Sequence, residues 1–108
     1  LLREDGDTLV IGPGIPRAWF NEEIVCEELP TYFGPVSFKI APDSDGAIIA
    51  VIDTPSRHTP AIIDLRIRHP ESRRIAGVTI NGKEHANFGD ESVKIRDASG
   101  RIELRAVF

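Results

Sequence analysis

Alternation of apolar and polar residues is clearest between residues 61 and 83. Residues 63–68 read Ile-Asp-Leu-Arg-Ile-Arg, and a period of two is typical of a half-buried β-strand. Further along, Ala76, Val78 and Ile80 share one face before Asn81-Gly82. This dipeptide favours a type I′ hairpin turn, because both central residues of that turn need positive φ. The middle of the chain is therefore predicted to be antiparallel sheet.

Turn signals such as Asp5-Gly6, Gly34-Pro35 and Ser99-Gly100 recur at short intervals, with runs rich in Ile and Val between them. Helical periodicity is absent over any useful length. Regularly spaced short strands favour a β-sandwich or a β-barrel. The predicted strands cover residues 8–11, 24–28, 36–41, 47–53, 62–68, 75–80, 93–96 and 101–108.

Two segments depart from simple alternation. Residues 47–52, Ala-Ile-Ile-Ala-Val-Ile, are apolar on both faces. Such a strand must be covered twice, by the opposite sheet and by a loop or something outside the chain. Residues 14–20, Gly-Ile-Pro-Arg-Ala-Trp-Phe, favour one short helical turn. We expect Trp19 to pack under the sheets there, because tryptophan buries a large apolar area.

Composition fits one ordinary globular domain of 108 residues, with 41% hydrophobic and 28% charged residues. The formal net charge of −4 argues against nucleic-acid binding, and no apolar run approaches a membrane span. Residues 1–30 hold seven acidic and two basic residues, a net charge of −5. The chain contains no methionine, so we expect it to be a piece of a longer protein.

The residues give no pattern for catalysis, a cofactor or a metal. His58, His69 and His85 lack zinc-site spacing and are expected to be solvated or hydrogen-bonded in loops. Cys26 cannot form an internal disulfide and is expected to be a buried structural thiol. The aspartates of residues 43–46, Asp-Ser-Asp-Gly, could bind calcium, but an Asp-Gly turn explains them more simply.

Paired carboxylates occur at Glu22-Glu23, Glu27-Glu28 and Asp90-Glu91. Neighbouring residues of a strand point to opposite faces, so Glu27 and Glu28 cannot form a catalytic pair. We expect a solvated acidic edge instead, which discourages edge-to-edge pairing of sheets.

Two groups of residues are candidates for a ligand or docking surface. The first is aromatic and consists of Trp19 and Tyr32. Tyr32 and Phe33 precede Gly34-Pro35, in a loop that could expose one of the two rings and bury the other. The second is a basic cluster beside His69, for which the plainer interpretation is a polar sheet face paired with Asp64 and Glu71. The candidates are Trp19, Tyr32, Arg66, Arg68 and Arg74, with Arg73 beside the last.

Three stretches together resemble a known family: LVIGPGIPRAWF (9–20), ELPTYFGPVSFKI (28–40) and LRIRHPESRRIAGVTINGK (65–83). They are similar to the C-terminal β-sandwich that follows the helical catalytic barrel of large bacterial glycosidases, such as the α-L-rhamnosidases. The resemblance implies an all-β, two-layer antiparallel sandwich that is jelly-roll-like, with about eight short strands and one helical turn near residues 15–20.

The resemblance also implies a role. In that family the catalytic acids lie in the barrel, so residues 1–108 would form a single non-catalytic accessory domain with no cofactor. Its expected partner is the catalytic domain of a parent chain, contacted through residues 47–52 and the front aromatic segment, and polysaccharide is a second candidate partner. Neither nucleic acid nor membrane is expected, and the resemblance favours a periplasmic or secreted location. The alternatives are a carbohydrate-binding module using exposed aromatics, and a small enzyme.

Overall fold

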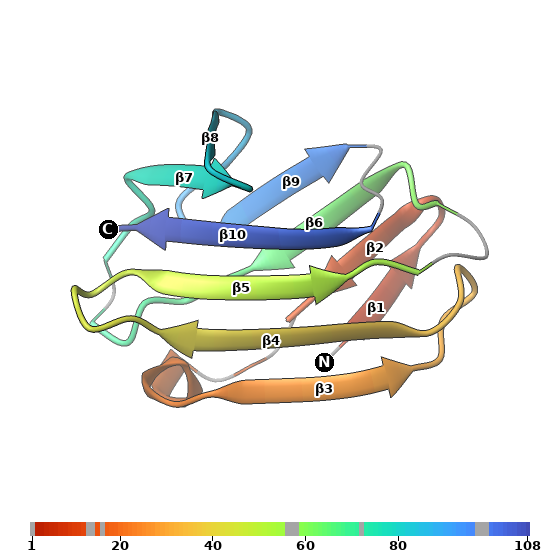
Figure 1. The fold of residues 1–108 in the computed structure, drawn as a ribbon, viewed down its shortest axis with the longest axis horizontal. Helices are drawn as coiled ribbons and strands as arrows, with labels where there is room; N and C mark the ends of the chain where they lie inside the picture. The colour runs from red at the N-terminus through yellow and green to blue at the C-terminus, as the bar shows by residue number, and fades with distance from the viewer. Residues whose placement is uncertain (1, 13–14, 16, 56–58, 72, 97–99) are drawn as a thin grey trace.

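The computed structural model describes residues 2–12, 15, 17–55, 59–71, 73–96 and 100–108. These form ten strands and one 3-10 turn, with no α-helix among them (Figure 1). The all-β prediction and the helical turn are confirmed. The elements are β1 (Leu2–Asp5), β2 (Thr8–Ile11), η1 (Arg17–Asn21), β3 (Ile24–Leu29), β4 (Val36–Pro42), β5 (Ile48–Asp53), β6 (Ile62–Arg66), β7 (Gly77–Ile80), β8 (Lys83–His85), β9 (Ser92–Arg96) and β10 (Arg101–Val107).

The strands form two sheets, which Figure 1 shows one in front of the other. The four-stranded sheet has the order β1-β2-β6-β9, and the six-stranded sheet has the order β3-β4-β5-β10-β7-β8. Alternate side chains of both sheets point inward and pack into one core, as two-layer sandwiches require. The predicted sandwich is confirmed. Its fully buried members include Leu9, Ile11, Ile63 and Leu65 from one sheet and Ile40, Ile48, Ile52 and Leu104 from the other.

One strand pair is parallel, whereas the sequence predicted antiparallel sheets throughout. Strand β2 pairs with β6 in parallel, with Thr8 opposite Ile62 and Ile11 opposite Leu65. Parallel strands need a long connection. Here the chain supplies it by building η1 and β3–β5 before it returns to the four-stranded sheet. The jelly-roll-like connectivity stays a prediction.

The hairpin turn is confirmed. Asn81 (φ 51°) and Gly82 (φ 84°) both have positive φ and join β7 to β8. Strands β1 and β8 were not predicted, because Leu-Arg-Glu-Asp and Lys-Glu-His carry little apolar alternation. Both lie at sheet edges, where charged side chains are acceptable.

The acidic edge predicted at β3 is also present. Strand β3 is an edge strand of the six-stranded sheet, and Glu22, Glu23, Glu27 and Glu28 are exposed along it. A register shift between Cys26 and Leu29 accompanies positive φ at Glu28 (49°). Charges and a bulge both discourage pairing with another sheet.

Candidate functional site

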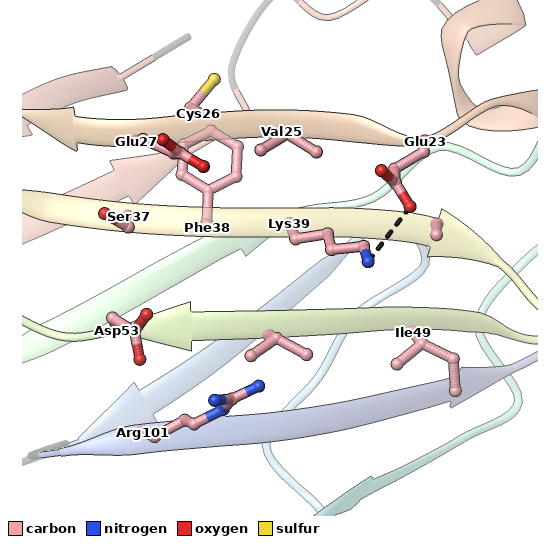
Figure 2. Close-up of a pocket in the computed structure, with 12 residues that line it drawn as sticks. Glu23, Val25, Cys26, Glu27, Ser37, Phe38, Lys39, Ile49, Asp53 and Arg101 are labelled. Carbon is pink, nitrogen blue, oxygen red and sulfur yellow. Dashed lines mark ion pairs between the residues drawn. The ribbon is translucent and has the colours of Figure 1, made fainter.

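The outward face of the six-stranded sheet carries a shallow hollow of about 410 Å³ over β3, β4 and β5 (Figure 2). We call it the β3–β5 hollow. Its apolar side chains are Val25, Ala41, Ile49 and Val51. Lys39 lies among them, and the other charged residues of the lining are Glu23, Glu27, Asp53 and Arg101.

Strand register explains how these residues meet. Lys39 lies between Val25 of β3 and Val51 of β5, and Ala41 lies opposite Ile49. Residues directly opposite each other in a sheet point to the same face. Every second residue of β4 and β5 therefore contributes to the hollow, while the residues between them enter the core.

The prediction that both faces of strand β5 are covered holds for its inner face. Its inward side chains, Ile48, Ala50 and Ile52, are at most 2% exposed. Its outward side chains, Ile49 and Val51, are only half-buried, and Val25 beside them is 49% exposed. The opposite sheet thus covers the inner face of β5, as predicted. The outer face of β5 lies in an open hollow.

The one ion pair within the described lining of the hollow is solvated. Lys39 Nζ lies 3.1 Å from Glu23 Oε2, and both side chains are 53% exposed. Exposed pairs of this kind contribute at most about 1 kcal/mol. Burial raises the pKa of the Cys26 thiol. The thiol therefore stays protonated at neutral pH, and its side chain is half-buried where the sequence predicted a buried one.

A second hollow of about 590 Å³ lies over β7, β8 and β10 and is called the β7–β10 hollow. Register places Arg105 opposite Thr79, and Thr79 opposite Glu84, so these three side chains form one row on the outward face. Ala76, Gly77, Ala86, Phe88 and Val107 supply its apolar surface.

The aspartates of the β4–β5 turn bind Arg105. Its Nη1 donates to Asp43 Oδ2 and its Nη2 donates to Asp45 Oδ2. The hydrogen bond from Arg105 is the largest cause that lowers the pKa of Asp43, followed by the backbone amide of Ser44, and the two carboxylates raise the pKa of Arg105. The stability from Asp43 is therefore present above the ordinary aspartate pKa and lost as pH falls through the lowered value.

The part of the chain that the structure describes holds no group of three or more His, Cys, Asp or Glu side chains placed to hold a metal ion. His85 Nε2 lies 2.7 Å from the Lys94 carbonyl, to which it must donate, and His69 Nδ1 accepts from the Glu71 amide at 3.0 Å. Both are hydrogen-bonded histidines, as predicted. His58 lies outside the described residues.

The structure corrects the prediction for Trp19. The Trp19 side chain is 53% exposed, whereas the side chain of Phe20 is 1% exposed and packs in the core. A 3-10 turn has three residues per turn, so adjacent side chains point in different directions and only one of the two rings can face the core.

The split predicted at Tyr32 and Phe33 is confirmed. Tyr32 is 65% exposed and Phe33 is 2% exposed, with their rings edge to face at 5.4 Å. The Tyr32 amide donates to Glu4 Oε1 at 2.8 Å, which ties the loop to β1. Because η1 precedes β3 and Tyr32 follows it, the exposed rings of Trp19 and Tyr32 lie near opposite ends of this strand and do not form one site.

The arginines likewise pair with different acids. Arg66 Nε and Nη2 donate to Asp64 Oδ2 at 3.2 and 3.0 Å, as predicted. Arg74 Nε lies 3.7 Å from Asp90 in an exposed pair, and Arg68 is exposed. Arg66 and Arg74 therefore contact different acids, and both lie on a charged surface.

Asp64 itself is unusual for a residue on the outward face of a sheet, because it is only 5% exposed. Its Oδ1 has no hydrogen-bond partner among the described residues. An unsatisfied buried oxygen costs about 1–3 kcal/mol. Arg66 thus offsets only part of the cost of burying this carboxylate.

No family model and no curated protein matches the chain. Within the described residues, no helix has the length and apolar character needed to cross a membrane. Sequence reasoning missed these two hollows, because each depends on the register between neighbouring strands, which the sequence does not give. The apolar outer face of residues 47–52 was the one signal that pointed to the β3–β5 hollow.

Proposed function

We propose that the chain is a non-catalytic accessory β-sandwich of a multidomain bacterial carbohydrate-active protein. It packs on the catalytic domain of the parent chain and stabilises it. The observation that carries this proposal is the group of outward-facing apolar side chains Val25, Ile49 and Val51 on the β3–β5 side of the six-stranded sheet.

The composition of the β3–β5 hollow supports docking of a protein surface. Protein interfaces combine apolar surface with solvated polar groups, as this hollow does. Among its charged residues Glu23, Glu27 and Asp53 outnumber Lys39 and Arg101. We therefore expect the partner surface on the catalytic domain to carry apolar residues together with an excess of basic ones.

The test is Val51→Glu in the full-length parent protein, followed by differential scanning calorimetry. The wild type should unfold in one coupled transition, because docking stabilises the catalytic domain. The variant should separate the two transitions, because a buried unpaired carboxylate disrupts the interface. We expect Val51→Glu to lower the equilibrium constant for docking at least tenfold, which corresponds to about 1.4 kcal/mol.

Ile62→Glu is the matched control. Ile62 is also a half-buried residue of an interior strand, but it lies in the four-stranded sheet. This variant should keep the coupled transition. Equal behaviour of Val51→Glu and the wild type would contradict the proposed docking surface.

A second candidate function, a carbohydrate-binding module, is favoured by the exposure of Trp19 (53%) and Tyr32 (65%). Flat aromatic faces beside polar groups suit sugar rings. The two rings are separated by the six-residue strand β3, which spans about 20 Å at about 3.3 Å per residue. A ligand contacting both would have to be an extended polysaccharide.

Retention on insoluble polysaccharide tests this candidate. Trp19→Ala and Tyr32→Ala should each weaken retention about tenfold if one chain contacts both rings, while circular dichroism stays unchanged. Trp19→Tyr should restore much of the binding by keeping an aromatic face. A wild-type protein that passes through unretained would exclude the candidate.

A further inference from the structure

We propose that the β7–β10 hollow binds a neutral sugar, one or two rings in size. This small-ligand site is separate from the β3–β5 hollow and does not depend on the docking function. Its volume of about 590 Å³ lies within the range of small-molecule pockets. It joins an apolar surface to a few polar groups, which is the usual composition of such pockets.

The polar groups form an ordered row. Arg105, Thr79 and Glu84 lie opposite one another on three adjacent strands, so their Cβ atoms are about 5 Å apart. The row runs from a hydrogen-bond donor, through a hydroxyl that both donates and accepts, to a carboxylate that only accepts. Sugar hydroxyls can both donate and accept, so a sugar ring can use all three groups.

Arg105 is held ready for this role. Its two Nη atoms bind Asp43 and Asp45, and a guanidinium has five N–H groups. Donors therefore remain for a ligand, while the two carboxylates fix the orientation of the side chain. A group held in advance in its binding geometry loses less entropy on binding.

The apolar side of the hollow gives a sugar ring something to pack on. Gly77 has no side chain and lies beside Val107, whose Cγ2 would be only 3.2 Å from a Cβ added at Gly77. Val107, which is 40% exposed, thus covers Gly77 and supplies the apolar surface at this point. Phe88 contributes an aromatic ring to the same lining.

Charge decides between ligand classes. Arg105 is outweighed by Asp43, Asp45 and Glu84, which leaves a net charge of −2 for these four residues. Phosphates and carboxylates are therefore disfavoured. A cationic amine would use Glu84 but not the donors of Arg105, so a neutral polyol fits the row better.

The experiment is a titration of the ¹⁵N-labelled chain with D-glucose, D-galactose and L-rhamnose, followed by amide chemical shifts. Glucuronate and spermidine serve as anionic and cationic probes. We expect saturable shifts with at least one neutral sugar at amides of β7, β8 and the end of β10, at millimolar concentrations.

Isosteric variants then test the row. Thr79→Val keeps the shape and β-branching while removing the hydroxyl, and Glu84→Gln removes the charge. Each substitution should raise the dissociation constant about fivefold or more, because it removes roughly one hydrogen bond to the sugar. Glu27→Gln in the β3–β5 hollow is the control for charge removal and should leave binding unchanged.

Three outcomes would overturn the proposal. The first is the absence of shifts with every neutral sugar. The second is binding of spermidine or glucuronate alone. The third is sugar-dependent shifts confined to the surroundings of Trp19 and Tyr32, which would place carbohydrate binding at the exposed aromatics instead.

Discussion

Replacing Ile52 with alanine is expected to lower the free energy of unfolding by about 2–5 kcal/mol, the usual cost of truncating a fully buried isoleucine. Ile52 is 0% exposed and lies between Phe38 and Ile102 of the flanking strands. The loss combines apolar surface returned to water with the cavity left in the core. Urea denaturation of the isolated chain measures it, provided that the denaturant slope is unchanged.

Ile49→Ala is the control within the same strand. Ile49 points to the β3–β5 hollow and is already half-buried, so the substitution should cost no more than about 1 kcal/mol in the isolated chain. In a docked parent protein the same substitution should weaken the interface. Equal losses for Ile52→Ala and Ile49→Ala in the isolated chain would mean that β5 does not have one inner and one outer face.

Local pattern was enough to predict the sheets but not how they are ordered. Alternation over residues 63–68 and the Asn81-Gly82 turn each depend on neighbours in the sequence, and both predictions are confirmed. The parallel pairing of β2 with β6 joins residues more than fifty positions apart. No local pattern distinguishes that partner from another apolar strand.

The candidate sites show the same limit. Sequence could not decide whether Trp19 or Phe20 enters the core, because both are large and apolar and the direction of the turn depends on its contact with β4. The bond between Arg105 and Asp43 joins positions 62 residues apart. Asp43 and Asp45 were interpreted from their own turn alone, so the arginine that binds them was missed.

Gly12→Ala is expected to destabilise the chain by about 2–5 kcal/mol, for two separable reasons. Gly12 has φ +87°, which costs an alanine about 1–2 kcal/mol. An added Cβ would also lie 2.7 Å from the backbone oxygen of Arg66. Relieving that overlap requires a shift of the backbone between β2 and β6, at a further cost of about 1–3 kcal/mol.

Gly46→Ala separates the two contributions, because Gly46 has nearly the same φ (+90°) but nothing within 4 Å of an added Cβ. It should cost about 1–2 kcal/mol from conformation alone, and the difference between the variants, measured by urea denaturation, reports the contact. Adding Arg66→Ala to Gly12→Ala should not recover this difference, since the overlap is with the carbonyl oxygen and not with the side chain. If both glycine variants lost the same stability, the backbone of β6 would shift beside β2 at little cost, and the contact with the Arg66 carbonyl would contribute nothing to the effect of Gly12→Ala.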